Sequence, residues 1–92
     1  MKTSYIVSVI TNDGLMRTGL KMIINGNNIS FSFMNKVIKE KRIDSIRKIT
    51  LANVEWQIGK WVVIYFEDEI IKINTFNSNK KIYSYLLTTL NI

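Results

Sequence analysis

The chain has 92 residues, 47% hydrophobic and 22% charged, a composition typical of a globular protein, so we expect residues 1–92 to form a single domain. It contains no cysteine and no histidine, which excludes disulfides, thiol and imidazole catalysis and nearly every zinc or copper site within it. Thirteen basic and seven acidic side chains give a net charge of +6, which favours contact with anionic partners.

Residues 5–25 predict the first two strands and the turn between them. Residues 5–11 are apolar and β-branched, as strands are. Asp13-Gly14 follows, and this dipeptide between two apolar runs is typical of a tight hairpin turn. Residues 15–25 predict a second strand that is long enough to bend, and Gly19 is the expected site of that bend.

A third strand is predicted after a turn at residues 26–28. Ile29, Phe31 and Phe33 alternate with serines, so we expect these three side chains to share one buried face. A further turn is expected at Asn35-Lys36.

Residues 37–43 predict a fourth strand that is charged and exposed on one side. Ile43, Ile46 and Ile49 then recur at every third position. This spacing favours a short turn that leads into a strand over residues 47–52. A helix over residues 44–52 is the alternative, because apolar residues three apart also share a helix face.

The last third of the chain changes from strand to helix spacing. Residues 61–66 and 70–76 predict two strands joined by an acidic turn at residues 67–69. Residues 78–90 predict an amphipathic helix, since their apolar residues recur at helical spacing. These residues are Ile82, Tyr83, Leu86, Leu87 and Leu90.

About seven strands and one C-terminal helix predict a mainly β protein, an antiparallel β-barrel or sandwich with the helix packed on it. This order, the Ile29-Ser30-Phe31 strand and the spacing of Ile43, Ile46 and Ile49 resemble pleckstrin-homology-like domains, in particular GRAM and bacterial or archaeal PH-like domains. The resemblance implies two orthogonal sheets, with the helix over one open end. Phosphoinositide-binding members carry basic residues around the first hairpin, and the turn here does not, so the resemblance implies the fold and not that ligand.

Residues 36–48 hold six basic and two acidic side chains, which is +4 of the net charge of +6. The basic residues are Lys36, Lys39, Lys41, Arg42, Arg47 and Lys48. We expect them to form a face that binds an anionic ligand: nucleic acid, an acidic membrane surface or an acidic protein. Lys39 and Lys41 share one strand face and are expected to face water. The alternative is that the lysines protect an edge strand from aggregation.

Trp56 lies in a predicted loop between Glu55 and Gln57 and is the candidate for an exposed protein interface. Other aromatic residues, Trp61 and Phe66 among them, could form a stacking platform for nucleic acid. On the strands of a small domain, aromatic side chains are more typical of the core.

No residues here suggest catalysis. A serine or threonine nucleophile needs a base beside it, and no spacing in the chain provides one. The glycines form no phosphate-binding loop. The acidic turn at residues 67–69 lacks further ligands that would converge on a metal ion, so we expect a solvated turn, no metal and no cofactor.

We therefore expect a non-catalytic binding or adaptor module that acts through protein–protein contacts or self-association, without a small-molecule substrate. The alternative is a small basic β-barrel protein that binds nucleic acid non-specifically. The short N-terminal apolar run does not fit a signal peptide, and no stretch approaches the roughly 20 apolar residues of a membrane span. Together with the absence of cysteine, this favours a cytoplasmic location.

Overall fold

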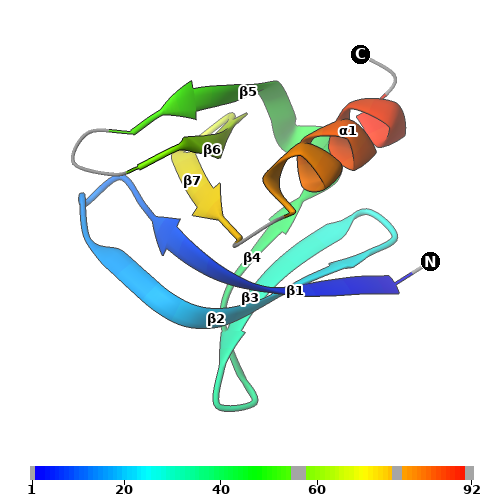
Figure 1. Ribbon diagram of the computed structural model, residues 1–92. Coiled ribbons are helices and arrows are strands. Elements are labelled where there is room, and N and C mark those ends of the chain that lie inside the picture. Colours follow the sequence, from blue (N-terminus) through cyan, green and yellow to red (C-terminus); the bar gives the residue numbers. More distant parts are fainter. Residues whose placement is uncertain (1, 55–57, 76–77, 91–92) are drawn as a thin grey trace.

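The computed structural model describes residues 2–54, 58–75 and 78–90 (Figure 1). Seven strands, one short 3-10 turn and one C-terminal helix follow one another along the chain. They are β1 (Lys2–Ile10), β2 (Met16–Asn25), β3 (Asn28–Phe33), β4 (Lys36–Arg42), η1 (Ile43–Ser45), β5 (Ile46–Asn53), β6 (Lys60–Phe66), β7 (Ile70–Asn74) and α1 (Asn79–Leu90). The predicted mainly β fold with one C-terminal helix is confirmed.

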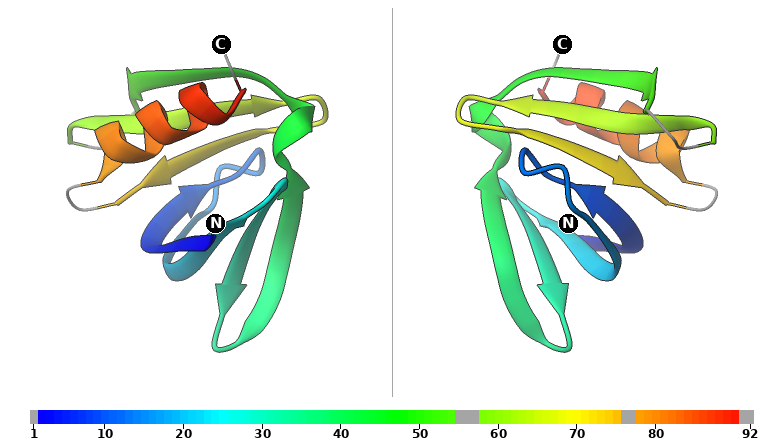
Figure 2. Two further views of the ribbon diagram at one scale, coloured as in Figure 1. Left: turned by 90° about the vertical axis from the view of Figure 1, so that its right-hand side faces the viewer. Right: turned by 90° about the vertical axis from the view of Figure 1, so that its left-hand side faces the viewer.

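All seven strands belong to one antiparallel sheet, in the order β4-β3-β2-β1-β7-β6-β5. The only pairing in this order between strands far apart in sequence joins β1 to β7, at Ser8↔Asn74, Val9↔Ile73 and Ile10↔Lys72. The sheet bends sharply there, so that β1–β4 and β5–β7 form two facing layers (Figure 2). In the described part of the chain β4 and β5 do not pair with each other, so the sheet is open and not a closed barrel.

The core lies between these two layers and under α1. β6 is buried over most of its length, as the continuous apolar run of residues 61–66 predicts. Ile71 and Ile73 of β7 are fully buried. Ile82 and Leu86 of α1 are also fully buried, and the other apolar residues of the helix stripe pack against the same core. The amphipathic helix therefore covers one end of the bent sheet.

Gly19 marks a bulge in β2, as expected. The β1–β2 register passes from Val7↔Leu20 to Val9↔Arg17, so that one more residue lies on β2 than on β1. Gly19 has a φ of +72°, a left-handed conformation that only glycine adopts without strain. This bulge bends β2 around the core.

The predicted alternation in β3 is wrong at its end. Ile29 and Phe31 are buried, but Phe33 is 49% exposed and Ser32 is buried. The cause is a second bulge, because the β3–β4 register shifts between Phe31 and Ser32 and leaves Ile38 without a cross-strand partner. Such a bulge increases the local twist, and the β3–β4 hairpin projects beyond the body of the sheet (Figure 2).

The β3–β4 turn also lies one residue earlier than expected. Met34 and Asn35 form it, and both have positive φ angles, of 52° and 67°. Two consecutive positive φ angles are the mark of the tight turns that suit twisted hairpins.

The segment after β4 is a short turn followed by a strand, so the favoured prediction of a strand is confirmed and the alternative of a helix over residues 44–52 is wrong. Ile43, Ile46 and Ile49 are all buried. The side chain of Asn27, in the β2–β3 turn, donates to Asp44 Oδ2 at 2.9 Å and accepts from the Asp44 N–H at 3.0 Å. The backbone carbonyl of Asn27 accepts from the Ile43 N–H at 2.7 Å. Asn27 therefore holds η1 against the end of the first layer.

The start of α1 is fixed by Asn79. Its Oδ1 accepts from the Thr75 N–H at 2.8 Å, and its Nδ2 donates to the Lys60 carbonyl at 2.9 Å and to Asn74 Oδ1 at 2.7 Å. One amide thus ties the helix to both β6 and β7. Among the described residues, no helix is long and apolar enough to cross a membrane.

Candidate functional site

The predicted basic face lies along β4, η1 and β5, where acidic side chains neutralise much of it. Lys39 Nζ donates to both oxygens of Glu69, at 2.7 and 2.8 Å. Lys41 Nζ donates to both oxygens of Asp68, also at 2.7 and 2.8 Å, and lies 3.0 Å from Glu69 Oε1. Two strand lysines therefore hold the acidic β6–β7 turn.

A third pair continues this contact along β5. Arg47 Nη2 lies 2.9 Å from Glu67 Oε1, and both side chains are more than half exposed. We call the six residues of these pairs the charged seam. They are Lys39, Lys41, Arg47, Glu67, Asp68 and Glu69. Three positive and three negative charges cancel, so the seam is neutral as a whole.

The remaining basic residues differ from one another. Arg42 binds Asp44 through two hydrogen bonds, of 3.1 and 2.8 Å, on the surface. Lys48 Nζ lies 5.4 Å from the ring centroid of Tyr65, the residue opposite it on β6. No ion pair joins Lys36 or Lys48 to an acid within the ranges that the structure describes.

The expectation that Lys39 and Lys41 both face water is wrong for Lys41. Its side chain is only 13% exposed, whereas that of Lys39 is 32% exposed. The expected solvated acidic turn is likewise wrong at Glu69, whose side chain is 14% exposed. Both side chains are shielded from water for the same reason: the Lys41 ammonium and the Glu69 carboxylate lie against each other.

Three residues of the seam, Lys41, Asp68 and Glu69, hold their charges over a wide pH range. Burial alone would lower the pKa of Lys41, but the hydrogen bonds to Asp68 and Glu69 outweigh it and raise that pKa. Burial would raise the pKa of Glu69, but the hydrogen bonds from Lys39 and Lys41 lower it below its ordinary value. The hydrogen bond from Lys41 also lowers the pKa of Asp68. At neutral pH every one of these groups is therefore ionised.

The pairs that Lys39 and Lys41 make in the seam cross the open side of the sheet. Lys39 and Lys41 belong to the edge strand β4, and the acids that they bind lie between β6 and β7. No strand pairing closes this side in the described residues, so side-chain ion pairs take that place. We assign the seam a structural role on this ground.

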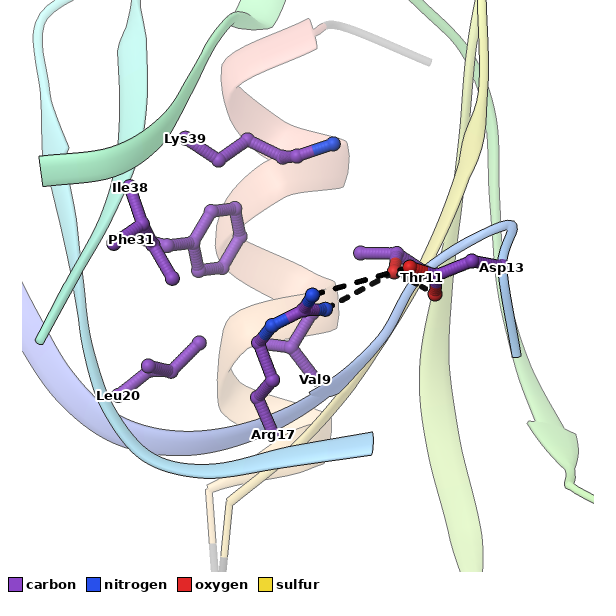
Figure 3. Close-up of a pocket in the computed structure, with 8 residues that line it drawn as sticks. All are labelled: Val9, Thr11, Asp13, Arg17, Leu20, Phe31, Ile38 and Lys39. Carbon is purple, nitrogen blue, oxygen red and sulfur yellow. Dashed lines mark hydrogen bonds and ion pairs between the residues drawn. The ribbon is translucent and has the colours of Figure 1, made fainter. Parts of the chain in front are cut away.

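A cavity of ≈ 390 Å³ opens beside the seam, between the first four strands (Figure 3). Val9, Leu20 and Phe31 form its apolar base, and each is at most 3% exposed. Its rim consists of Thr11, Asp13, Arg17, Ile38 and Lys39. We call this space the Arg17 cavity.

The guanidinium of Arg17 is held only loosely at the rim. Nη1 donates to Thr11 Oγ1 at 3.4 Å, and Nη2 lies 3.9 Å from Asp13 Oδ2, beyond hydrogen-bond distance (Figure 3). Asp13 instead accepts from the Thr11 hydroxyl at 2.6 Å and from the Leu15 N–H at 3.0 Å. These two bonds, that from Thr11 foremost, lower the pKa of Asp13. Arg17 thus keeps donors that an incoming group can use.

A second cavity of ≈ 390 Å³ continues from the first and shares Arg17, Leu20 and Ile38 with it. It extends to Phe33 and the base of the β3–β4 hairpin. Four apolar side chains of this hairpin are exposed by 46–84%, and we call them the hairpin strip. They are Phe33, Met34, Val37 and Ile38.

Trp56, the predicted interface residue, lies outside the described residues. The interpretation of the other aromatic residues as core is confirmed for Trp61 and Phe66, which are 1% and 5% exposed. Among the residues that the structure describes, no group of acids is placed to hold a metal ion.

The cavity and the hairpin strip were not expected from the sequence. The one signal for the strip is the apolar content of residues 33–38 around a turn, where polar residues are usual. The cavity has no local signal, because four strands contribute to its lining. A scan of the chain against protein-family models finds no match, and no curated protein matches it significantly.

Proposed function

We propose that the protein is a non-catalytic binding module that acts through contact with another protein. The observation that carries this proposal is the hairpin strip, since it gathers exposed apolar side chains on one projecting hairpin. Apolar side chains grouped at the surface are the usual mark of an interaction site. The hairpin also projects away from the body of the fold, which leaves it accessible to a partner.

Two residues of the strip, Val37 and Ile38, lie on the edge strand β4, and this supports a protein partner in particular. A strand edge offers backbone N–H and C=O groups that a partner chain can pair with. The order of strands and helix is also in keeping with the resemblance to pleckstrin-homology-like domains, which remains a prediction.

Binding of nucleic acid by the basic face is the weaker candidate. Four of the six basic residues predicted to bind anions are already paired with acids of the same chain. Displacing those acids would offset much of what a phosphate contact contributes. Lys36 and Lys48 do not by themselves form the extended positive surface that non-specific binding uses.

The test is affinity capture from cells of the native organism with three proteins: wild type, Val37→Glu and Ile58→Glu. Both substitutions replace an exposed apolar side chain by an acid, but Val37 belongs to the strip and Ile58, 99% exposed, lies in the β5–β6 connection. We expect the same captured protein with wild type and Ile58→Glu, and its loss with Val37→Glu. Nuclease and 0.5 M salt should leave the capture unchanged.

Two results would contradict the proposal. Loss of the captured protein on nuclease treatment would assign the contact to nucleic acid. Equal capture by the Val37→Glu and Ile58→Glu variants would place the contact away from the strip. The remaining alternative is that the partner is a second copy of the chain. In that case the purified wild type should sediment as a dimer at micromolar concentration, and otherwise as a monomer.

A further inference from the structure

We propose that the Arg17 cavity binds a small amphipathic monocarboxylate, an aliphatic chain or aromatic ring that carries one carboxylate. This site goes beyond the proposed function, because its ligand is a small molecule and not a protein, although Ile38 and the adjoining Phe33 also belong to the hairpin strip. Its base is apolar and buried, and one loosely held guanidinium lies at its rim. Apolar walls with a few polar groups that fix orientation are the usual composition of small-molecule sites.

The size of the cavity fits such a ligand. A volume of ≈ 390 Å³ lies within the range of roughly 300–1,000 Å³ that ligand sites occupy. The adjoining cavity, which Arg17 also lines, extends the apolar surface to Phe33. A ligand with its charged group at Arg17 therefore has room for a chain of several carbons along Leu20 and Ile38.

The charges at the rim select a single negative charge. Arg17 and Lys39 are the two cations, and Asp13 and Glu69 are the acids beside them. Lys39 is bound to both oxygens of Glu69, so Arg17 is the rim cation whose charge no hydrogen-bonded carboxylate already balances. A phosphate dianion would approach two carboxylates against one available cation, whereas one carboxylate matches Arg17, whose planar fork suits it.

The ligand carboxylate would take the place of weak contacts only. The bond from Arg17 to Thr11 is 3.4 Å long and the distance to Asp13 is 3.9 Å, and neither is of the length of a strong charged hydrogen bond. Asp13 keeps its bonds from Thr11 and Leu15 when Arg17 turns away. The loop that carries Thr11 and Asp13 therefore stays in place during binding.

The test is an NMR titration of the full chain with sodium octanoate below its micellar concentration. We expect saturable shifts of the Val9, Leu20, Phe31 and Ile38 signals, with a dissociation constant on the order of 1 mM or below. Acetate, which lacks the chain, should give no saturable shift. Octanol, which lacks the charge, should bind at least about fivefold more weakly than octanoate.

Arg17→Met removes the charge and keeps an unbranched side chain. It should reduce the affinity for octanoate to that for octanol, while Lys21→Met, at an exposed position on the same strand, should leave octanoate binding unchanged. Backbone amide spectra of both variants establish that the fold is intact. Absence of a saturable octanoate shift, shifts centred on other residues, or equal octanoate affinity for wild type and Arg17→Met would each overturn the assignment.

Discussion

Replacing Glu69 by glutamine should destabilise the protein through the charged seam. Glu69 accepts from Lys39 at 2.7 Å and lies 3.0 Å from Lys41, and its side chain is only 14% exposed. The glutamine side chain would keep the shape and one acceptor but lose the negative charge. The ammonium groups of Lys39 and Lys41, which share this largely covered carboxylate, would then lie close together without its negative charge.

The expected magnitude follows from the contacts that are lost. A hydrogen bond to a charged group contributes about 1.5–3 kcal/mol. Lys39 is about one-third exposed and Lys41 keeps its bonds to Asp68, so solvent and the second acid offset part of the loss. We expect the free energy of unfolding to fall by about 1–2 kcal/mol, which lowers the melting temperature of a domain of this size by about 4–16 °C.

Urea and thermal denaturation followed by circular dichroism measure this change, with Asp68→Asn as the matched control. Asp68 binds Lys41, as Glu69 does, but the Asp68 side chain is 72% exposed. Its replacement should therefore lower the free energy of unfolding clearly less. Equal losses for the Glu69 and Asp68 variants would refute the argument, because burial of the shared carboxylate is what separates them.

The difference between wild type and Glu69→Gln should also depend on pH. The hydrogen bonds from Lys39 and Lys41 lower the pKa of Glu69 in the folded protein. The stabilisation is therefore fully present above the unfolded pKa of about 4.3 and is lost as the pH falls through the folded value. Denaturation at pH 7 and at a series of lower pH values should show a difference that becomes smaller as Glu69 is protonated in the folded protein, and a difference of the same size throughout would contradict the assignment.

Three further substitutions test the fold, each by urea denaturation. Asn79→Ala should cost about 1–3 kcal/mol, since it removes the bonds that tie α1 to β6 and β7, while the exposed Ser84→Ala should cost little. Leu86→Ala should cost about 2–5 kcal/mol, because that side chain is fully buried. Gly19→Ala should cost about 1–2 kcal/mol through backbone strain alone, since nothing lies within 4 Å of the added Cβ, and Gly19→Asn should cost less.

Local signals predicted most of the fold. The strands, the helix and the bend at Gly19 each depend on a few neighbouring residues, whose apolar spacing or backbone freedom decides the structure. The end of β3 was mispredicted because its orientation depends on a bulge in β4, and a bulge shifts the alternation of side chains without a mark in β3 itself. The exposure of Phe33 therefore cannot be predicted from the sequence of β3 alone.

The charged seam shows why the site was harder to predict than the fold. Counting charges over residues 36–48 gave a concentrated positive face, but the acids that pair with Lys39 and Lys41 lie 30 and 27 residues further along the chain. Only the bend of the sheet brings the two segments together. The Arg17 cavity has the same origin, since its lining comes from four strands and no single segment carries it.

The order of the strands also divides the chain into two pieces for folding. Every neighbouring pair of strands in the sheet is a hairpin of consecutive strands except β1 and β7, which join residues more than 60 positions apart. Hairpins close short loops quickly, whereas the β1–β7 contact has to close a loop of about two-thirds of the chain, so this contact should limit the folding rate. A chain break at η1 would cut no strand pairing of the described sheet. The segments β1–β4 and β5–α1 are therefore natural fragments for reconstituting the protein from two separate peptides.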